Sequence, residues 1–165
     1  MGGGTREEAI AREERMTFEL RLVHTAIMTQ RKYQIELGPV TEKNAHVVKV
    51  ILEASSPMKV EASSHGQIGY CSDFAVGCIC FTTSSDTLHV NAVAVLPAYR
   101  GLGLGSRMLE WAEARAKSDG LKHMRLHVLA SSHEAKAFFE SKGYAVKEIS
   151  KDDTGNDTLL MSKEI

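Results

Sequence analysis

A glycine-rich turn between an apolar run and a helical pattern constrains the fold of this chain more than any other feature. Segment 100–105 has the sequence RGLGLG, the valine- and alanine-rich run 90–95 precedes it, and Met108, Leu109 and Trp111 follow at helical spacing. Glycines keep side chains away from the backbone N–H groups, and a helix amino terminus adds about half a positive charge. The segment therefore predicts a strand, a turn and a helix that together bind an anion such as a diphosphate.

Three kinds of motif compete for this segment. A Rossmann dinucleotide fingerprint needs glycine or alanine where Ser106 stands, and it belongs on the first strand of a parallel unit. A P-loop needs a lysine followed by serine or threonine, which this segment lacks. A tight turn without a ligand remains open on the residues alone. Arg100 favours the anion site, because it adds a full positive charge beside the turn.

Alternating and helical hydrophobic patterns predict the elements on both sides of the turn. Thr41 is predicted to cap the first helix, whose apolar face contains Val47, Val48, Ile51 and Leu52. The predicted order is strand 33–37, a helix after residue 41, loop 55–67, strands 68–71, 75–82 and 87–95, helix 106–118, strand 123–128, helix 132–142, and strands 145–149 and 158–161. This order predicts an α/β domain with a mixed central sheet of about six or seven strands flanked by helices.

The charge balance and the cysteines indicate the compartment and exclude some partners. The 165 residues include 20 Lys and Arg and 21 Asp and Glu, a formal net charge of −1. This balance provides no basic surface for nucleic acid or an anionic membrane, and no apolar run approaches the ~20 residues of a membrane-spanning helix. Cys71, Cys78 and Cys80 are odd in number, and we expect them to be reduced core residues. We expect a cytoplasmic or nucleocytoplasmic protein that binds neither nucleic acid nor membrane.

The first thirty residues differ in pattern from the rest of the chain. Thr5 and Glu8 have the spacing of a capping box, whereas residues 17–23 alternate like a strand. We therefore expect an N-terminal extension, or an addition foreign to the natural chain, over residues 1–30. Residues 31–165 are long enough to form one domain with its own core.

The glycine turn and the elements after it resemble a known family. The segment NAVAVLPAYRGLGLGSRML is similar to the signature of the GNAT superfamily of N-acetyltransferases, with Arg100, Gly103 and Gly105 at its Arg/Gln-x-x-Gly-x-Gly/Ala positions. Residues 126–128 and 135–144 resemble the strand and helix that follow in that family. The resemblance implies the GNAT fold, acetyl-CoA as cofactor with CoA as product, and acetyl transfer to an amine.

By this resemblance the cofactor contacts the fourth strand, the glycine turn and the helix after the next strand. An amide at or beside Val93, at a bulge in the strand, would polarise the thioester carbonyl. Phe139 stands where many members carry a tyrosine, and it has no hydroxyl to donate. The implied cofactor-binding residues are Val93, Ala94, Val95, Arg100, Gly101, Leu102, Gly103, Leu104, Gly105, Ser106, Ser132 and Phe139.

A narrower resemblance, to amino-terminal acetyltransferases of the NatE type, implies the catalytic residues. The sequences IELGPVT at 35–41 and LHV at 126–128 resemble that group, which holds a water between a tyrosine and a histidine. His127 matches the histidine, whereas His89 stands in place of the tyrosine. A histidine is a sufficient base for an α-amino group, whose pKa is about 7.7–8.0. His123 lies roughly 13 Å from His127 at ~3.3 Å per strand residue, so no metal site is predicted.

The acceptor side resembles the NatE type less closely. That group holds the peptide terminus with a Phe-Pro-Val segment and with tyrosines, whereas this chain has Ser56, Pro57 and Met58 there and no tyrosine in its last hairpin. The implied substrate-binding residues are Pro57, Met58 and Asn91. Three functions stay open: transfer to a protein N-terminus, within or without an N-terminal acetyltransferase complex that contains a partner subunit; transfer to a lysine or a small amine; and acyl-CoA binding without catalysis.

Overall fold

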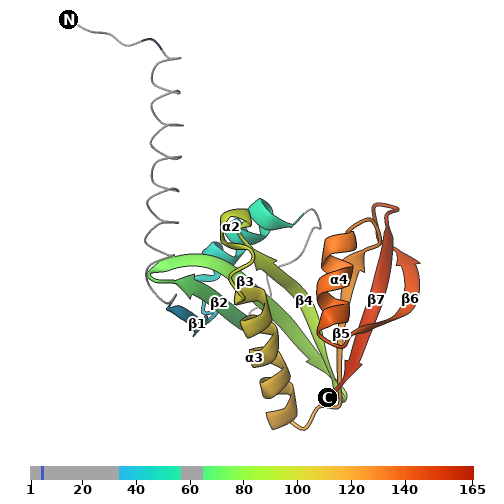
Figure 1. The fold of residues 1–165 in the computed structure, drawn as a ribbon. Helices are drawn as coiled ribbons and strands as arrows, with labels where there is room; N and C mark the ends of the chain where they lie inside the picture. Colours follow the sequence, from blue (N-terminus) through green and yellow to red (C-terminus); the bar gives the residue numbers. More distant parts are fainter. Residues whose placement is uncertain (1–4, 6–33, 57–64) are drawn as a thin grey trace, which may run out of the picture. The chain divides into compact units, whose positions relative to one another are not determined.

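The computed structural model contains a seven-stranded mixed sheet within the described residues, in the order β1-β2-β3-β4-β5-β7-β6 (Figure 1). Neighbouring strands are antiparallel, except β4 and β5, which are parallel. The predicted mixed sheet is thereby confirmed. The strands are β1 Ile35–Pro39, β2 Gly66–Cys71, β3 Phe74–Ser84, β4 Thr87–Val95, β5 His123–Leu129, β6 Ala145–Lys151 and β7 Asp157–Glu164.

The structure describes residue 5 and residues 34–56 and 65–165, and residues 35–165 form one compact unit. The predicted substrate residues Pro57 and Met58 lie outside the described residues. The predicted extension over residues 1–30 lies outside them too, apart from Thr5, so the domain boundary stays a prediction. Within the described part of the chain, no helix is both long and apolar enough to span a membrane.

β4 and β5 pair over only part of their length. Residues 87–90 pair in register with residues 123–126, and no pairing follows, although β4 continues to Val95 and β5 to Leu129. Figure 1 shows β4 and β5 spreading apart from a common end. Two parallel strands that separate in this way leave a gap in the middle of the sheet.

A β-bulge lies in β4 at the level where this gap begins. Cys80 pairs with Ala92 and Phe81 pairs with Val90, so Asn91 has no partner residue on β3. A bulge bends its strand and increases the local twist. This irregularity therefore helps to turn β4 away from β5, and it lies two residues before Val93, beside which the sequence comparison implied a bulge.

The helices cover both faces of the sheet. Helix α2, Ala45–Ser55, packs on one face, where its buried residues Val48, Ile51 and Leu52 meet Cys78 and Cys80 of β3. The predicted core face of this helix is confirmed. All three cysteines are buried and free of disulfide bonds.

Helices α3, Leu104–Ser118, and α4, His133–Ser141, lie on the opposite face. Trp111 of α3 contacts Phe81 of β3, with ring centroids 5.9 Å apart. The Phe138 ring of α4 lies close to the first turn of α3, since a Cβ at Gly105 would meet its Cζ atom at 3.5 Å. The first turn of α3 and the second turn of α4 are therefore close together, and residues of both line the cavity between β4 and β5.

The amino terminus of α2 differs from the sequence prediction. Asn44, not Thr41, is its N-cap residue, and the helix begins at Ala45. The Asn44 side chain accepts a hydrogen bond from the Thr41 N–H at 2.7 Å and donates one to the Pro39 carbonyl at 3.0 Å. These two bonds close a turn ahead of the helix, so the predicted cap at Thr41 is wrong by three residues.

Candidate active site

A cavity of about 540 Å³ lies where β4 and β5 separate. Its walls come from β4 after Val90, from β5 after Leu126, from the first turns of α3 and α4, and from Leu52, Ser55 and Ser56 at the end of α2. This volume is typical of sites for small molecules and cofactors. Beyond Val90, the backbone groups of β4 that point toward β5 have no strand partner in the described part of the chain. The cavity therefore exposes backbone polar groups that a ligand can satisfy.

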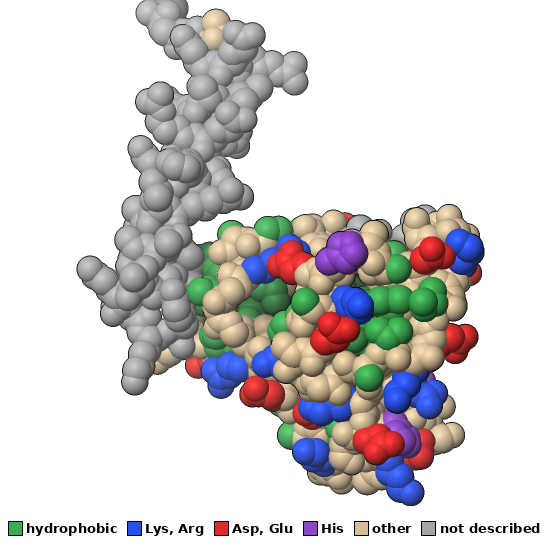
Figure 2. All heavy atoms as spheres, turned by 45° about the vertical axis from the view of Figure 1, so that its right-hand side comes forward, with side chains coloured by type: hydrophobic (Ala, Val, Ile, Leu, Met, Phe, Trp, Pro, Cys, Tyr) green, Lys and Arg blue, Asp and Glu red, His purple; other side chains and the backbone are tan. Residues whose placement is uncertain are grey.

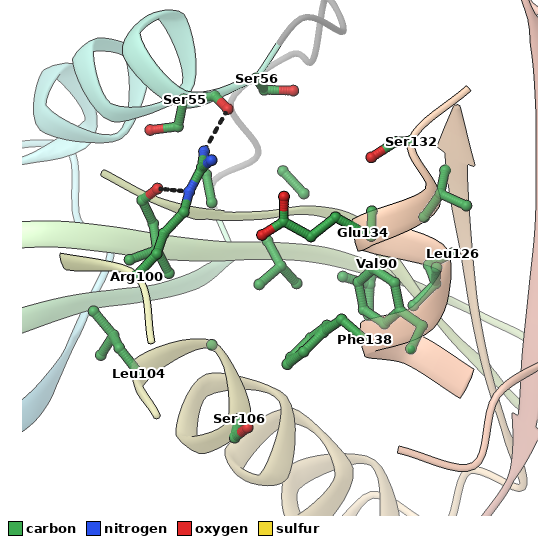
Figure 3. Close-up of a pocket in the computed structure, with 18 of the residues that line it drawn as sticks. Ser55, Ser56, Val90, Arg100, Leu104, Ser106, Leu126, Ser132, Glu134 and Phe138 are labelled. Atoms are coloured by element: carbon green, nitrogen blue, oxygen red, sulfur yellow. Dashed lines mark hydrogen bonds between the residues drawn. The ribbon is translucent and has the colours of Figure 1, made fainter. Parts of the chain in front are cut away.

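The glycine turn forms the cavity wall at the start of α3 (Figure 3). Gly101 and Gly103 have φ values of +80° and +81°, a region that favours glycine, and a Cβ at either position would meet no atom within 4 Å. Helix α3 begins at Leu104, two residues earlier than predicted. The N–H groups of residues 101–106 donate no hydrogen bond to another described residue; the first helical bond runs from the Arg107 N–H to Gly103. The turn thus presents a run of unused donors to an anion.

The amino terminus of α4 faces the same cavity. Ser132 is its N-cap residue, and Ser132, Glu134 and Ala135 line the cavity. Among the described residues, the N–H groups of Glu134 and Ala135 have no acceptor, because the first helical bond begins at Lys136. The positive ends of two helix dipoles therefore meet at one cavity. The Glu134 carboxylate, which lies inside the cavity in Figure 3, partly offsets this positive potential.

Arg100 lines the cavity but uses part of its guanidinium to hold the wall together. Its Nε donates to the Val95 carbonyl at 3.1 Å and one terminal nitrogen donates to the Ser55 carbonyl at 3.2 Å, as Figure 3 shows. Ser55 ends α2, so the positive charge also lies at the negative end of that helix dipole. Arg100 therefore ties α2 to the end of β4 in addition to placing a positive charge beside the amides.

All the residues predicted to bind the cofactor line the cavity, except Leu102. Leu102 is half-buried and is absent from the cavity wall, whereas its neighbours Gly101 and Gly103 line the cavity. Phe139 is 8% exposed and packs edge to face against Phe138, with ring centroids 5.1 Å apart. The two rings form an apolar wall of the cavity beside the start of α3. Contact of these residues with a cofactor stays a prediction.

The described residues fit coenzyme A in three respects. The amides of residues 101–106 and the two helix amino termini suit its diphosphate. The phenylalanine wall and the valines of β4 suit its apolar parts, and the backbone edge after Val90 suits its amides. The open space at the Cβ positions of Gly101 and Gly103 lets phosphate oxygens reach the backbone.

The two predicted catalytic histidines occupy different places. His127 lines the cavity and is exposed, whereas His89 is half-buried and lies outside the cavity wall. His89 pairs in register with Arg125, so His89, Arg125 and His127 have side chains on one face of the sheet, the face that α2 covers farther along. Burial, and then the positive charges of Arg125 and of protonated His127, hold the pKa of His89 below its ordinary value. His89 is therefore uncharged at neutral pH and can accept a proton.

Replacing Arg125 with glutamine is expected to raise the pKa of His89. The substitution removes a positive charge that disfavours the imidazolium form, while the larger effect of burial remains, so the pKa rises toward but not fully to 6.5. The measurement is an NMR titration of the His89 ring protons. Lys117→Gln, which removes a positive charge from α3 on the opposite face, should leave the titration unchanged; an equal shift in both variants would contradict a local effect of Arg125.

The sequence did not predict the part of the cavity wall that comes from the end of α2 and from Tyr99. It did predict Asn91. Leu52, Ser55, Ser56 and Tyr99 line the cavity, although no motif marks them. The link between Arg100 and Ser55 joins residues far apart in the chain, so no local pattern could have indicated it. Asn91, predicted to bind substrate, lines the cavity at the bulge, and its side-chain oxygen accepts a long hydrogen bond of 3.4 Å from Thr82.

The sequence of this chain is similar to those of known proteins. A family model described as the acetyltransferase (GNAT) family matches residues 39–144. N-alpha-acetyltransferase 50 from Danio rerio is 28% identical over 134 residues, which cover 73% of this chain and 80% of that protein.

Solved structures of low identity share the fold. Arabidopsis thaliana Naa50, in complex with the bisubstrate analogue CoA-Ac-MVNAL, superposes with a TM-score of 0.71 at 20% identity and covers 79% of this chain and 99% of that one. The ribosomal-protein-S18-alanine N-acetyltransferase from Escherichia coli superposes with a TM-score of 0.71 at 18% identity and covers 80% and 94%.

Proposed function

This chain belongs to the acetyltransferase (GNAT) family, and from that premise we propose that it transfers an acetyl group to the α-amino group of a protein or peptide N-terminus. It is an enzyme, and its acetyl donor is acetyl-CoA. The choice of an N-terminal α-amino group is supported by the similarity to N-alpha-acetyltransferase 50 and by the match of His127 to the histidine of that group.

One observation carries the proposal: residues from both faces of the sheet line a single cavity. The glycine turn and the first turn of α4 lie on the α3 and α4 side, whereas His127 projects from the opposite face. If the diphosphate occupies the amides on the first side, an acceptor amine can approach only from the second. Donor and acceptor then meet in the gap between β4 and β5, beside His127.

The residues of the gap suit the proton transfers that acetylation needs. Bound acetyl-CoA supplies an acetyl group activated as a thioester. An unpaired β4 amide at or beside Val93 can donate to the carbonyl oxygen, where negative charge develops during attack. His127, directly or through a water, accepts the proton that the amine must lose, and it can return a proton to the CoA thiolate that leaves when the C–S bond breaks. An α-amino group with a pKa of about 7.7–8.0 is already partly neutral at pH 7, so a histidine suffices as the base.

The alternatives are tested by the acceptor that the enzyme uses. We expect acetylation of peptides with a free N-terminus, and none of the same peptides when the N-terminus is blocked and only a lysine side chain is free. Intact-mass measurement with acetyl-CoA, a peptide panel, polyamines and amino sugars makes the comparison. Turnover of a lysine or a small amine without any N-terminal product would support the second function, and CoA binding without transfer to any amine would support a non-catalytic subunit.

A further inference from the structure

A second hollow, of about 560 Å³, lies over β5, β7 and β6. Arg125 lines it, together with His123 at one end of β5 and Ser162 of β7, the residue that pairs with Arg125. Arg125 is two residues from His127 along β5, on the same face of the strand. The two side chains are therefore separated by about 6.6 Å along the strand. The hollow thus adjoins the side from which the acceptor approaches.

The guanidinium of Arg125 is not engaged by any residue that the structure describes. Its side chain makes no hydrogen bond or ion pair with any described residue, and it is exposed. Two other basic groups of the hollow are more constrained: His123 lies 3.7 Å from Asp86, and Lys163 binds Glu113 at 2.9 Å. Arg125 therefore presents a permanent positive charge that can bind an acidic ligand group in the hollow.

The remaining charges of the hollow lie on other strands or farther along the sheet. Glu148 and Lys147 are on the edge strand β6, and Glu164 pairs in register with His123 at the end of β5. The carboxylates of Glu148 and Glu164 disfavour an acidic ligand group at those places, and the positive charge of Lys147 lies next to Glu148 on β6. An acidic group in the hollow is therefore best placed at Arg125, whose planar fork can bind a carboxylate through two parallel hydrogen bonds.

We propose that Arg125 selects acceptors that carry an acidic side chain at the second or third residue. This inference rests on the proposed function. An extended peptide with its α-amino group at His127, running along β5 toward His123, advances about 3.3 Å per residue. Its second or third residue then lies level with Arg125. An aspartate or glutamate there forms an ion pair with the guanidinium. An asparagine or glutamine binds it less strongly, and a lysine is repelled by it.

The test compares peptides that differ by one charge. Peptides of one length carry Glu, Gln or Lys at position 2, or at position 3, with every other residue uncharged. For the natural chain we expect kcat/KM for Glu to exceed that for Gln by about fivefold, the size of one partly exposed charge pair. Arg125→Gln should bring the ratio of Glu to Gln near one, and Arg125→Lys should retain part of the preference for Glu. Arg125→Glu should make the Lys peptide a better acceptor than the Glu peptide. Lys117→Gln is the control and should keep the natural ratio.

The ratio separates selectivity from other effects of the substitution. A change in the pKa of His89 alters turnover of all acceptors by the same factor, so it cancels in the ratio. Peptides acetylated equally whatever their charge, with Arg125→Gln unchanged in selectivity, would overturn the role of Arg125 and leave N-terminal acetylation intact. No acetylation of any peptide, with transfer to a small amine, would instead defeat the proposed function.

Discussion

Replacement of Gly103 with glutamate is expected to remove the thermal stabilisation that coenzyme A gives this protein and to lower kcat/KM at least ~100-fold. Two effects combine. The φ of +81° costs a side-chain-bearing residue roughly 1–2 kcal/mol. The carboxylate would also enter the open space beside the amides of residues 101–106, where it repels a diphosphate. Thermal shift with increasing CoA and calorimetric titration measure the binding directly.

Gly120 offers a matched control for this substitution. It has a φ of +73°, and a Cβ there would also meet no atom within 4 Å, but it follows α3 at the end remote from the cavity. Gly120→Glu therefore carries similar backbone strain and the same charge without touching the site. We expect it to lower the melting temperature modestly and to keep the full CoA shift. A full CoA shift in Gly103→Glu as well would exclude the glycine turn as the diphosphate site.

Replacement of His127 with alanine is expected to lower kcat by about 10²–10⁴, the usual contribution of general acid–base catalysis. Among the described residues, His127 is the histidine that lines the cavity between β4 and β5, so its loss removes the proposed proton acceptor. The backbone amides of residues 101–106, which are predicted to bind the cofactor, lie on the other side of the sheet and are not changed by this substitution. The dissociation constant of CoA should therefore change by less than about twofold, which calorimetry can establish beside the kinetics.

His123→Ala tests whether position matters in addition to residue type. His123 lies on the same strand and the same face but does not line the cavity between β4 and β5. Its Nε2 lies 3.7 Å from a carboxylate oxygen of Asp86. We expect its kcat to stay within about twofold of the natural value for an uncharged acceptor. If His127→Ala also kept its rate and its pH profile, His127 would have no role in proton transfer, and the remaining candidate would be His89.

Much of the fold follows from local patterns. The alternation of Thr87–Val95 predicted β4 with the bounds that the structure has. The apolar face of α2 was predicted through Val48, Ile51 and Leu52, because helical periodicity reports burial directly. Helix boundaries were less predictable. The competition between Thr41 and Asn44 for the cap depends on which side chain reaches the turn backbone, and hydroxyl and amide caps have similar intrinsic preference.

The glycine turn is the part of the site that the sequence by itself determined. Positive φ values at Gly101 and Gly103 and the free amides ahead of α3 are properties of a few consecutive residues. Such properties depend on local sterics and on the geometry of a helix start, so they can be inferred without knowledge of distant contacts. The conformation of the turn was predictable for this reason.

Only the tertiary structure decided what that turn faces. The gap exists because residues 87–90 pair with residues 123–126 and then stop, and its walls require α2 to reach Arg100 across the sheet. The same pairing sets Arg125 beside His89. Strand register and helix docking are decided by the burial of apolar side chains from segments far apart in the chain. No local pattern records which distant segment supplies the partner surface.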